Sequence, residues 1–261
     1  LGPGSWETVR EVPLRGLRNV GNTCFLNSVA QVLMRTPAMV EWVMHHHAQG
    51  CLHEQGGCLL CAVALTVKQI KQGGQGARSV PVIAQRRADV GEAFADGEQH
   101  DAVEFFEQLL ANVREGEIAA NRFGIWGGIQ IDRSVATHAE RLFGFVRETR
   151  RRCTQCRGPV RSWFSCEHVL RLQPRIVAGG AMTVAEMYLE SCAPVEGGED
   201  VVCPVCERTT SHESQSRIKS APNVLVVQMR RIGGVRPGVD VELQLDVPGL
   251  PAMELIGVLY H

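Results

Sequence analysis

The sequence predicts an α+β fold, because its helical patterns come first along the chain and its strand patterns come later. Apolar residues between positions 102 and 113 recur at spacings of three and four, which is typical of an amphipathic helix. Residues 239–247 alternate strictly between apolar and polar side chains, which predicts a strand with one solvent-facing side. The β-branched run Val224–Val227 follows Pro222 and predicts a short buried strand.

Three helices are expected before residue 140, at about residues 22–34, 58–72 and 98–113. Asn22 or Thr23 can cap the first helix, and Pro37 is expected to stop it. A glycine-rich break follows the second helix. Asp96 or Gly97 is the expected cap of the third.

The composition indicates a globular protein without an obvious polyanionic or membrane partner. Hydrophobic residues make up 44% of the 261 positions and charged residues 21%, which is ordinary for a folded domain. This length allows one large domain or two modest ones. The formal net charge of −1 gives no support for binding nucleic acid, and no apolar run approaches the ~18 residues that a membrane span needs. We therefore expect neither partner.

The cysteine content favours thiol chemistry or metal binding over a disulfide framework. The chain has ten cysteines, and its first residues lack the apolar segment of a secretory signal. Disulfides are rare in reducing compartments, so the expected location is the cytoplasm or the nucleus.

Both ends of the sequence look cut. The chain does not begin with Met, and it stops at His261 directly after the apolar run Leu255–Tyr260, which reads as a strand. Domains seldom end at the last residue of a buried strand, so we expect the domain to be incomplete.

The most informative segment is residues 16–28, which place Cys24 at the start of the first helix. The positive end of the helix dipole favours a thiolate, which is the nucleophilic form of cysteine. Glycine and asparagine before Cys24 allow a tight turn whose N–H groups, with a side-chain amide, can hold an oxyanion. From chemistry alone, the favoured interpretation of Cys24 is a buried structural thiol.

The pattern Gly-Leu-x-Asn-x-Gly-Asn-Thr-Cys-Phe-x-Asn-Ser in residues 16–28, followed by Gln31 and Leu33, resembles the cysteine box of the ubiquitin-specific proteases. The resemblance extends over some eighteen residues. It implies that Cys24 is the nucleophile of a cysteine-type deubiquitinase. It also implies that Asn19 supplies the amide that helps to bind the oxyanion.

Residues 98–105 resemble a second box of the same family, Gln-Gln-Asp-Ala-x-Glu-Phe. Taken alone, Asp101 and Glu104 are acidic residues that suit the first turn of a helix. The resemblance implies that Asp101, with Gln99 second, binds the basic C-terminal tail of ubiquitin. It also implies that His100 faces the substrate and is not the general base.

Two Cys-x-x-Cys motifs predict a structural zinc site formed by Cys153, Cys156, Cys203 and Cys206. Residues 157–202 separate the two motifs, which is long for an isolated zinc ribbon. Four reduced cysteines without metal are the alternative. In the family that the sequence resembles, such motifs close the fingers that grip the body of ubiquitin.

A second group of possible ligands consists of Cys51, His53, Cys58 and Cys61. Cys58 and Cys61 open an apolar helix, and small thiols are common in protein cores, so a core role is favoured over a second metal. The triplet His45–His47 is interpreted as a helix end on the surface.

The resemblance implies a papain-like catalytic domain over residues 14–261, with a thumb at about 14–140, fingers at about 141–220 and a partial palm at about 221–261. In the family, the strand near the end of this chain precedes a Gly-His-Tyr box with the general base, and a later Asp or Asn orients that histidine. Neither box is present. The truncated chain is therefore expected to be inactive by itself.

Two other functions stay open at this point. One is a ubiquitin-binding scaffold without turnover, which keeps Asp101 and the fingers but lacks a base. The other is a zinc-ribbon adaptor for nucleic acid, for which the basic cluster Arg150–Arg152 is thin support.

Overall fold

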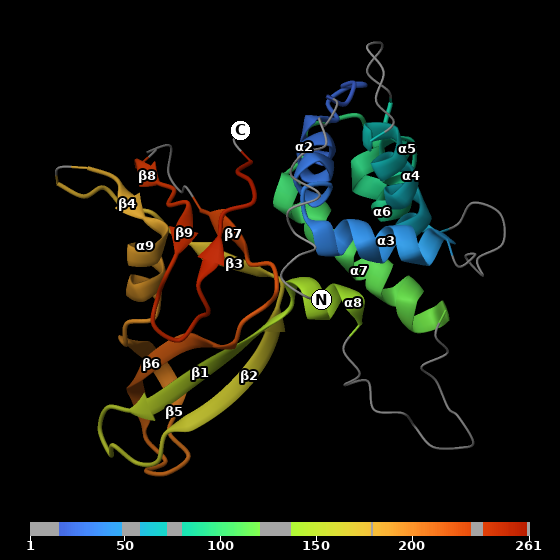
Figure 1. The fold of residues 1–261 in the computed structure, drawn as a ribbon. Helices are drawn as coiled ribbons and strands as arrows, with labels where there is room; N and C mark the ends of the chain where they lie inside the picture. Colours follow the sequence, from blue (N-terminus) through green and yellow to red (C-terminus); the bar gives the residue numbers. More distant parts are fainter. Residues whose placement is uncertain are drawn as a thin grey trace, which may run out of the picture. The chain divides into compact units, whose positions relative to one another are not determined.

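The computed structural model describes residues 16–48, 58–71, 80–120, 137–178, 180–230 and 237–259. The chain divides into two compact units (Figure 1). Unit 1 takes in the chain up to Leu142 together with Ile256–His261, and unit 2 holds Phe143–Leu255. Helices dominate the first and strands the second, which confirms the α+β prediction. The division into thumb, fingers and palm stays a prediction.

The described elements of unit 1 are helical. They are α2 (Cys24–Leu33), α3 (Pro37–Ala48), α4 (Leu59–Lys71), α5 (Val82–Gln85), α6 (Arg87–Val90), the 3₁₀ helix η2 (Glu92–Ala95) and α7 (Ala102–Ala120), with α8 (His138–Phe143) at the boundary with unit 2. None of the described helices is both long enough and apolar enough to cross a lipid bilayer.

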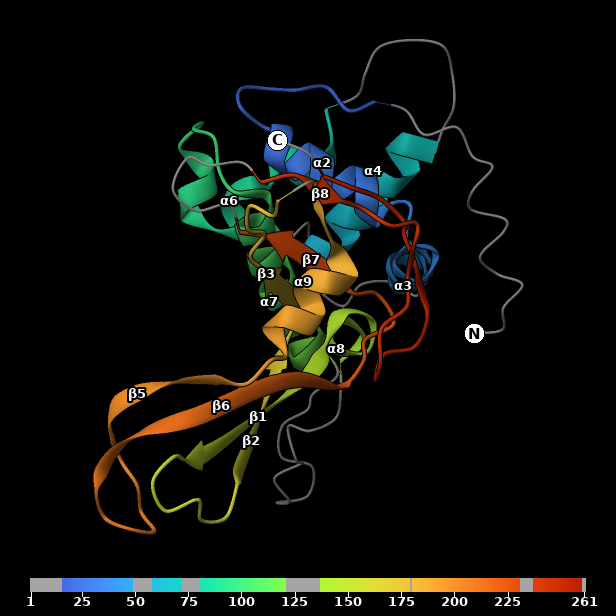
Figure 2. The same ribbon diagram turned by 90° about the vertical axis from the view of Figure 1, so that its left-hand side faces the viewer.

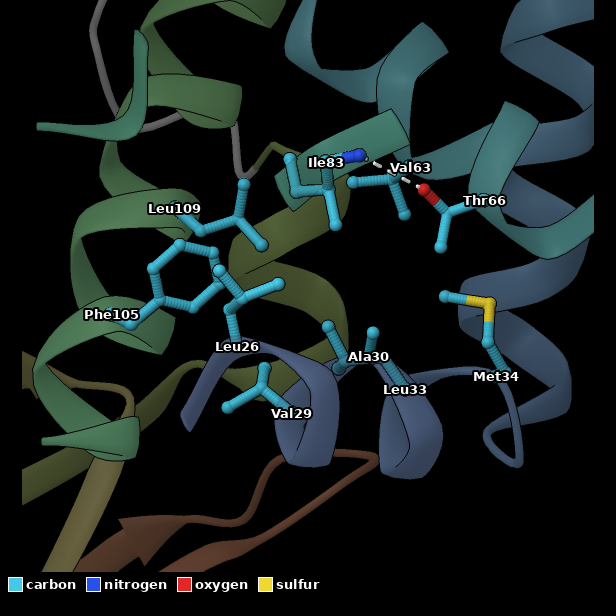
Figure 3. A pocket seen from close by; sticks show the side chains of 10 residues that line it. All are labelled: Leu26, Val29, Ala30, Leu33, Met34, Val63, Thr66, Ile83, Phe105 and Leu109. Carbon is cyan, nitrogen blue, oxygen red and sulfur yellow. Dashed lines mark hydrogen bonds between the residues drawn. The ribbon is translucent and has the colours of Figure 1, made fainter. Parts of the chain in front are cut away.

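The core of unit 1 lies where α2, α4, α5 and α7 meet. Figure 3 shows Leu26 of α2, Phe105 and Leu109 of α7, and Ile83 of α5 directed toward a common centre. Thr66 of α4 is buried there, and its hydroxyl accepts a hydrogen bond from the Ile83 N–H at 3.2 Å. The hydroxyl also donates to a helix carbonyl at 2.9 Å, so this buried polar group is satisfied.

Thr23, one of the two residues predicted to cap the first helix, is the N-cap residue of α2, whereas the predicted cap of the third helix was wrong. Helix α7 begins at Ala102, not near Glu98, and its cap is Asp101, not Asp96 or Gly97. The Asp101 carboxylate accepts two backbone N–H groups of the first turn, whereas Asp96 accepts from an N–H that precedes the helix.

Proline also acts differently from the prediction. Helix α2 ends at Leu33, and Pro37 is the first residue of α3. Proline suits the first helical position because the N–H group that it lacks would have no partner there.

The strands of unit 2 form several small sheets and one larger sheet. They are β1 (Phe145–Cys153), β2 (Arg161–Glu167), β3 (Val169–Leu172), β4 (Met182–Thr183), β5 (Val195–Val202), β6 (Thr209–Ser220), β7 (Val226–Met229), β8 (Val239–Asp240), β9 (Gln244–Leu245) and β10 (Met253–Glu254), with helix α9 (Val184–Ser191) after β4.

The larger sheet has the strand order β2-β1-β6-β5 and is antiparallel throughout. Figure 2 shows it as a long, twisted ribbon within unit 2. Cys153 at the end of β1 lies opposite His212 of β6. This pairing brings segments that are far apart in the sequence to the same end of the sheet.

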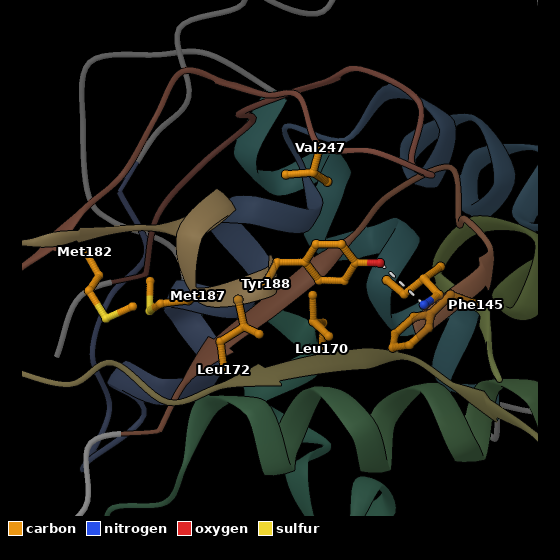
Figure 4. Close-up of a cluster of buried hydrophobic side chains, with 8 residues drawn as sticks. Phe145, Leu170, Leu172, Met182, Met187, Tyr188 and Val247 are labelled. Atoms are coloured by element: carbon orange, nitrogen blue, oxygen red, sulfur yellow. Dashed lines mark hydrogen bonds between the residues drawn. The ribbon is translucent and has the colours of Figure 1, made fainter. Parts of the chain in front are cut away.

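The smaller sheets pack around α9. Strand β3 pairs in parallel with β7, β4 pairs in parallel with β8, and β9 pairs with β10. Figure 4 shows the buried cluster that joins them, with the Tyr188 ring between Val247 and Leu170. The Tyr188 hydroxyl accepts a hydrogen bond from the Ile218 N–H at 3.4 Å.

Three strand predictions need correction. The alternating segment 239–247 is two short strands in different sheets, and Leu243 between them is 77% exposed. The buried strand expected at Val224–Val227 is β7, shifted by two residues and half-buried. In the run Leu255–Tyr260, residues 255–259 are in no strand, and the last of the described strands is β10.

Candidate active site and metal centres

The loop before α2 brings Cys24 to the first position of that helix. Gly21 and Asn22 both adopt left-handed backbone conformations, with φ of 61° and 54°. Glycine adopts this conformation without strain and asparagine tolerates it better than most residues, which explains the Gly-Asn pair. The Cys24 thiol is half-buried at the positive end of the helix dipole, where a thiolate is favoured.

Asn19 is oriented by Thr23. Its Oδ1 accepts hydrogen bonds from the Thr23 N–H and from the Thr23 hydroxyl, each at 2.9 Å. A backbone N–H can only donate, so this bond identifies the oxygen end of the Asn19 amide. The side chain is exposed, and Nδ2 has no hydrogen bond to any residue that the structure describes. The amide therefore has two N–H groups available for a substrate oxygen.

The two sequence boxes lie beside each other in space. Asn22 Nδ2 donates to the Gly97 carbonyl at 2.9 Å, which ties the loop before α2 to the loop before α7. Gln99 Nε2 lies 3.8 Å from Cys24 Sγ, at the distance of a weak N–H···S contact. Gln99 thus reaches the predicted nucleophile directly.

Asp101 serves as the cap of α7. Its Oδ1 accepts the N–H groups of Val103 at 2.7 Å and Glu104 at 3.0 Å. The side chain is exposed, and its second oxygen forms no hydrogen bond within the described chain. That oxygen can accept a donor from a bound partner.

His100 is bonded to an acidic side chain. Its Nε2 lies 2.9 Å from Asp96 Oδ1, and its ring packs edge-on against Phe25 and Phe94 at 5.4 and 5.1 Å. The hydrogen bond with His100, followed by one from the Glu98 N–H, holds the pKa of Asp96 below its usual range. None of the described histidines forms a hydrogen bond with Cys24 Sγ.

Sequence reasoning missed two supporting residues. Thr23 is 1% exposed, and its hydroxyl also accepts a hydrogen bond from the Val20 N–H at 3.0 Å. Asn27 is 9% exposed, and its Nδ2 donates to the Arg18 carbonyl at 3.2 Å. A polar Asn in the first turn of an apolar helix, four residues after Thr23, was the available signal.

The two Cys-x-x-Cys motifs of unit 2 meet as predicted. The Sγ atoms of Cys153, Cys156, Cys203 and Cys206 all lie within 4.8 Å of one another. Cys156 and Cys203 are 3.8 Å apart, which matches the roughly 3.8 Å between sulfurs that tetrahedral Zn–S bonds of about 2.3 Å give. The residues present therefore fit a zinc ion.

Both motifs have the same backbone turn. The residue after each motif, Arg157 or Glu207, has a left-handed backbone with φ of 48° or 57°. Its N–H donates to the carbonyl of the first cysteine, Cys153 at 3.2 Å or Cys203 at 2.7 Å. The turn gives each motif the same hairpin, which aims both thiols to one side.

The protonation of these thiols is uneven. A hydrogen bond with the Thr210 hydroxyl, at 3.1 Å, is the main reason that the pKa of Cys153 falls to about 6. The Gly158 N–H bonded to Cys156 acts to lower its pKa, yet burial and the other three thiols together raise it to about 11. Four thiolates this close repel one another, so full ionisation requires a cation between them.

A second group of ligand atoms lies in unit 1. His46, Cys58 and Cys61 place their ligand atoms within 4.8 Å of one another, and His46 Nε2 is 3.3 Å from Cys58 Sγ. The sequence favoured a core role for Cys58 and Cys61, but both thiols are half-buried. Cys51 and His53 lie outside the described residues.

Comparisons with known proteins agree with these motifs. A family model described as ubiquitin carboxyl-terminal hydrolase matches residues 15–236. Ubiquitin carboxyl-terminal hydrolase 25 of Arabidopsis thaliana is 24% identical over 88% of this chain and 35% of its own length. Ubiquitin carboxyl-terminal hydrolase 36 of Drosophila virilis is 29% identical over 83% of this chain and 18% of its own length. The chain thus spans about a third or less of these relatives.

The fold of this chain also matches solved structures of similar proteins. A structure described as the SAGA Ubp8/Sgf11/Sus1/Sgf73 DUB module bound to ubiquitin aldehyde matches with a TM-score of 0.73. The match covers 91% of this chain and 53% of the other, at 18% sequence identity. The resemblance to the ubiquitin-specific proteases is confirmed, and the chain belongs to the ubiquitin carboxyl-terminal hydrolase family.

Proposed function

We propose that this chain carries the catalytic machinery of a thiol-dependent deubiquitinase, which hydrolyses the bond after the C-terminal glycine of ubiquitin. One observation supports this above the others. Cys24 begins α2, the Gln99 amide lies 3.8 Å from its Sγ, and the Asn19 amide is held by Thr23, the residue directly before Cys24. A nucleophilic thiol and amide donors for an oxyanion are two of the parts that an acyl transfer to sulfur uses, and a general base is the third.

The proposed reaction proceeds through a thioester on Cys24. The thiolate attacks the glycine carbonyl carbon, a C–S bond forms, and the carbonyl oxygen becomes an oxyanion. Asn19 Nδ2 donates to this oxyanion, because its Oδ1 is already bonded to Thr23. The C–N bond then breaks, and the leaving amine takes a proton from the conjugate acid of the base. Water cleaves the thioester, which returns the thiolate and a free carboxyl group.

Substrate binding is assigned to the second box. The free oxygen of Asp101 accepts a guanidinium N–H from the basic tail of ubiquitin in a charge-assisted hydrogen bond. Gln99 lies against Cys24, so its amide is placed to contact the backbone of the scissile glycine. The partners are therefore ubiquitin and ubiquitinated proteins.

The general base is proposed to lie outside the described residues. None of the described histidines bonds to Cys24 Sγ, and His100 is bonded to Asp96. The sequence also contains no Gly-His-Tyr box. General acid–base catalysis contributes about 10²–10⁴ in rate, so we expect a chain without such a base to turn over ubiquitin substrates slowly.

The lack of a described histidine bonded to Cys24 also supports a second candidate, which is a ubiquitin-binding scaffold without turnover. Asp101 and the fingers would be retained for binding in such a protein. The two candidates differ in one measurable property, which is Cys24-dependent hydrolysis by the natural full-length protein.

We propose a structural zinc ion for the site formed by Cys153, Cys156, Cys203 and Cys206. Four thiolates fill a tetrahedral shell, so no position remains for water or substrate. The ion would hold the two hairpins at the end of the β1–β6 ribbon together, in the part of the chain proposed as fingers.

A reducing compartment suits this chemistry, and we propose the cytoplasm or the nucleus. All nine described cysteines are free of disulfide bonds.

The test is a hydrolysis assay on ubiquitin carrying a fluorogenic amide at its C-terminal glycine. The natural full-length protein and the 261-residue chain are each compared with their Cys24→Ser variants, and Cys166→Ser, an exposed thiol of β2, is the matched control. We expect turnover by the full-length protein that Cys24→Ser abolishes and Cys166→Ser leaves unchanged. A full-length protein that binds ubiquitin without Cys24-dependent turnover would contradict the enzyme and favour the scaffold.

A further inference from the structure

We propose that His46, Cys58 and Cys61 form a second zinc site, separate from the four-cysteine site and located in unit 1. The proposal does not depend on the deubiquitinase activity. It rests on the geometry, the burial and the chemical nature of these three side chains.

The distances suit a tetrahedral ion. The three ligand atoms lie within 4.8 Å of one another, and His46 Nε2 is 3.3 Å from Cys58 Sγ. Zinc bonds of about 2.0–2.1 Å to nitrogen and about 2.3 Å to sulfur, at tetrahedral angles, place such atoms roughly 3.6 Å apart. A small outward movement of the histidine ring therefore makes room for the ion.

Local structure explains how the sequence builds this site. Cys58 directly precedes α4 and Cys61 lies in its first turn, so residues three apart present their thiols on the same face of the helix. His46 lies in the last turn of α3. The site would thus connect the end of one helix with the start of the next.

Burial argues against ordinary core thiols. The neighbours Leu59, Leu60 and Ala62 are 9%, 4% and 1% exposed and form the core-facing side of α4. Cys58 and Cys61 are both less buried than these residues, and they face the half-buried imidazole of His46. Thiols that served only to fill the core would lie on the other side of the helix.

The donor set favours zinc over harder cations. One imidazole and two thiolates are borderline-soft and soft ligands, which suit Zn²⁺ and not Mg²⁺ or Ca²⁺. Two thiolates also balance the charge of a divalent ion. The described residues supply three of the four ligands that tetrahedral zinc takes, and Cys51 and His53 lie outside the described residues.

Metal analysis of the purified 261-residue chain tests the proposal. We expect two zinc ions per chain in the wild type and one in Cys61→Ser. His46→Ala should also lose one zinc, whereas His46→Cys should keep both, because a thiolate replaces the imidazole. His45→Ala, at the exposed neighbouring position, and Cys166→Ser are matched controls that should keep both.

A double variant tests the second site without any substitution at its own ligands. Cys153→Ser with Cys203→Ser eliminates the four-cysteine site and leaves His46, Cys58 and Cys61 intact. One remaining zinc is expected there. Replacement by Co²⁺ should then give tetrahedral ligand-field bands with a thiolate charge-transfer band of about half the intensity of a four-thiolate site.

The contradicting results are equally specific. A wild-type chain with a single zinc that Cys61→Ser does not remove would overturn the second site. A double variant without zinc would do the same. Neither result would bear on Cys24-dependent hydrolysis, so this proposal and the proposed function can fail separately.

Discussion

The side-chain oxygen of Asn19 accepts two hydrogen bonds from Thr23, one from its backbone N–H and one from its hydroxyl, each at 2.9 Å. This relationship turns an exposed asparagine into an oriented donor beside Cys24. It also separates the two ends of one amide, since the oxygen organises the first turn of α2 and the nitrogen has no hydrogen bond within the described residues.

Two substitutions of Asn19 should therefore have different effects on stability and similar effects on catalysis. Asn19→Asp keeps an acceptor for Thr23 but loses the N–H groups, so we expect kcat/KM of the full-length protein to fall about 10²–10³-fold. Asn19→Ala should lose similar activity and also destabilise the fold by about 1 kcal/mol. Fluorogenic ubiquitin hydrolysis and thermal unfolding measure the two effects. An Asn19→Asp enzyme with unchanged kcat/KM would remove Asn19 from the oxyanion site.

Two substitutions of Asp101 should likewise distinguish its role in ubiquitin binding from its role as the cap of α7. Asp101→Asn keeps the oxygen that caps α7 but loses the negative charge, so ubiquitin binding should weaken by about 1.5–3 kcal/mol with little change in Tm. Asp101→Ala should also cost about 0.5–2 kcal/mol of stability, because the cap is lost. Binding of ubiquitin without its C-terminal tail is the control, and it should be the same for wild type and Asp101→Asn. Unchanged affinity for intact ubiquitin would argue against the assignment of this box.

Removal of the four-cysteine site should destabilise unit 2 more than unit 1. Structural zinc contributes about 10–16 kcal/mol of apparent binding free energy in zinc-finger peptides, and this energy is coupled to folding. Cys203→Ser should therefore increase amide hydrogen exchange in β1, β5 and β6, with little change in α2 and α7. Unchanged exchange in β1 and β6 after zinc has been removed would contradict a structural role.

The paired carboxylate of Glu148 should make the stability of unit 2 depend on pH. It is 4% exposed and lies between Arg150 and Arg217, with each arginine Nε 3.0 Å from one of its carboxylate oxygens. The hydrogen bond with Arg150 is the main cause of a pKa below the ordinary 4.5, and Arg217 adds to it while burial opposes it. A lowered folded-state pKa means that the stabilisation is fully present above pH 4.5 and is lost as the pH falls through the folded-state value.

Glu148→Gln should therefore be less stable than wild type at neutral pH, and the difference should shrink as the pH falls below 4.5. Urea unfolding across this range measures it. Glu213→Gln, at an exposed position of β6, is the matched control and should show no such trend. A difference that grows toward low pH would contradict the assigned direction.

The sequence predicted features that depend on local spacing. The positions of α2, α4 and α7 followed from apolar periodicity, because the 3.6-residue repeat is a local property. The four-cysteine group followed from the spacing within each motif, although only the antiparallel pairing of β1 with β6 brings the motifs together.

Features that depend on tertiary pairing were missed or wrong. The alternation in residues 239–247 predicted one strand, but only Val239–Asp240 and Gln244–Leu245 are strands. They have partners in different sheets, which alternation cannot specify. Asp96 and Asp101 are both plausible caps by residue type, and only the backbone path selects Asp101. His46 was assigned to the surface because its approach to Cys58 depends on how α3 packs on α4.

The most direct test of the central claim is covalent capture of the nucleophile. Ubiquitin with a vinyl sulfone in place of its C-terminal carboxyl group reacts with a thiolate only when its tail is bound at the active site. Incubation with this protein, followed by peptide mapping, should give one adduct per chain, on Cys24, with none in Cys24→Ser and a slower reaction in Asp101→Asn. An adduct on another cysteine, or unchanged labelling of Cys24→Ser, would contradict the assignment of Cys24 as the residue that attacks the C-terminal glycine of ubiquitin.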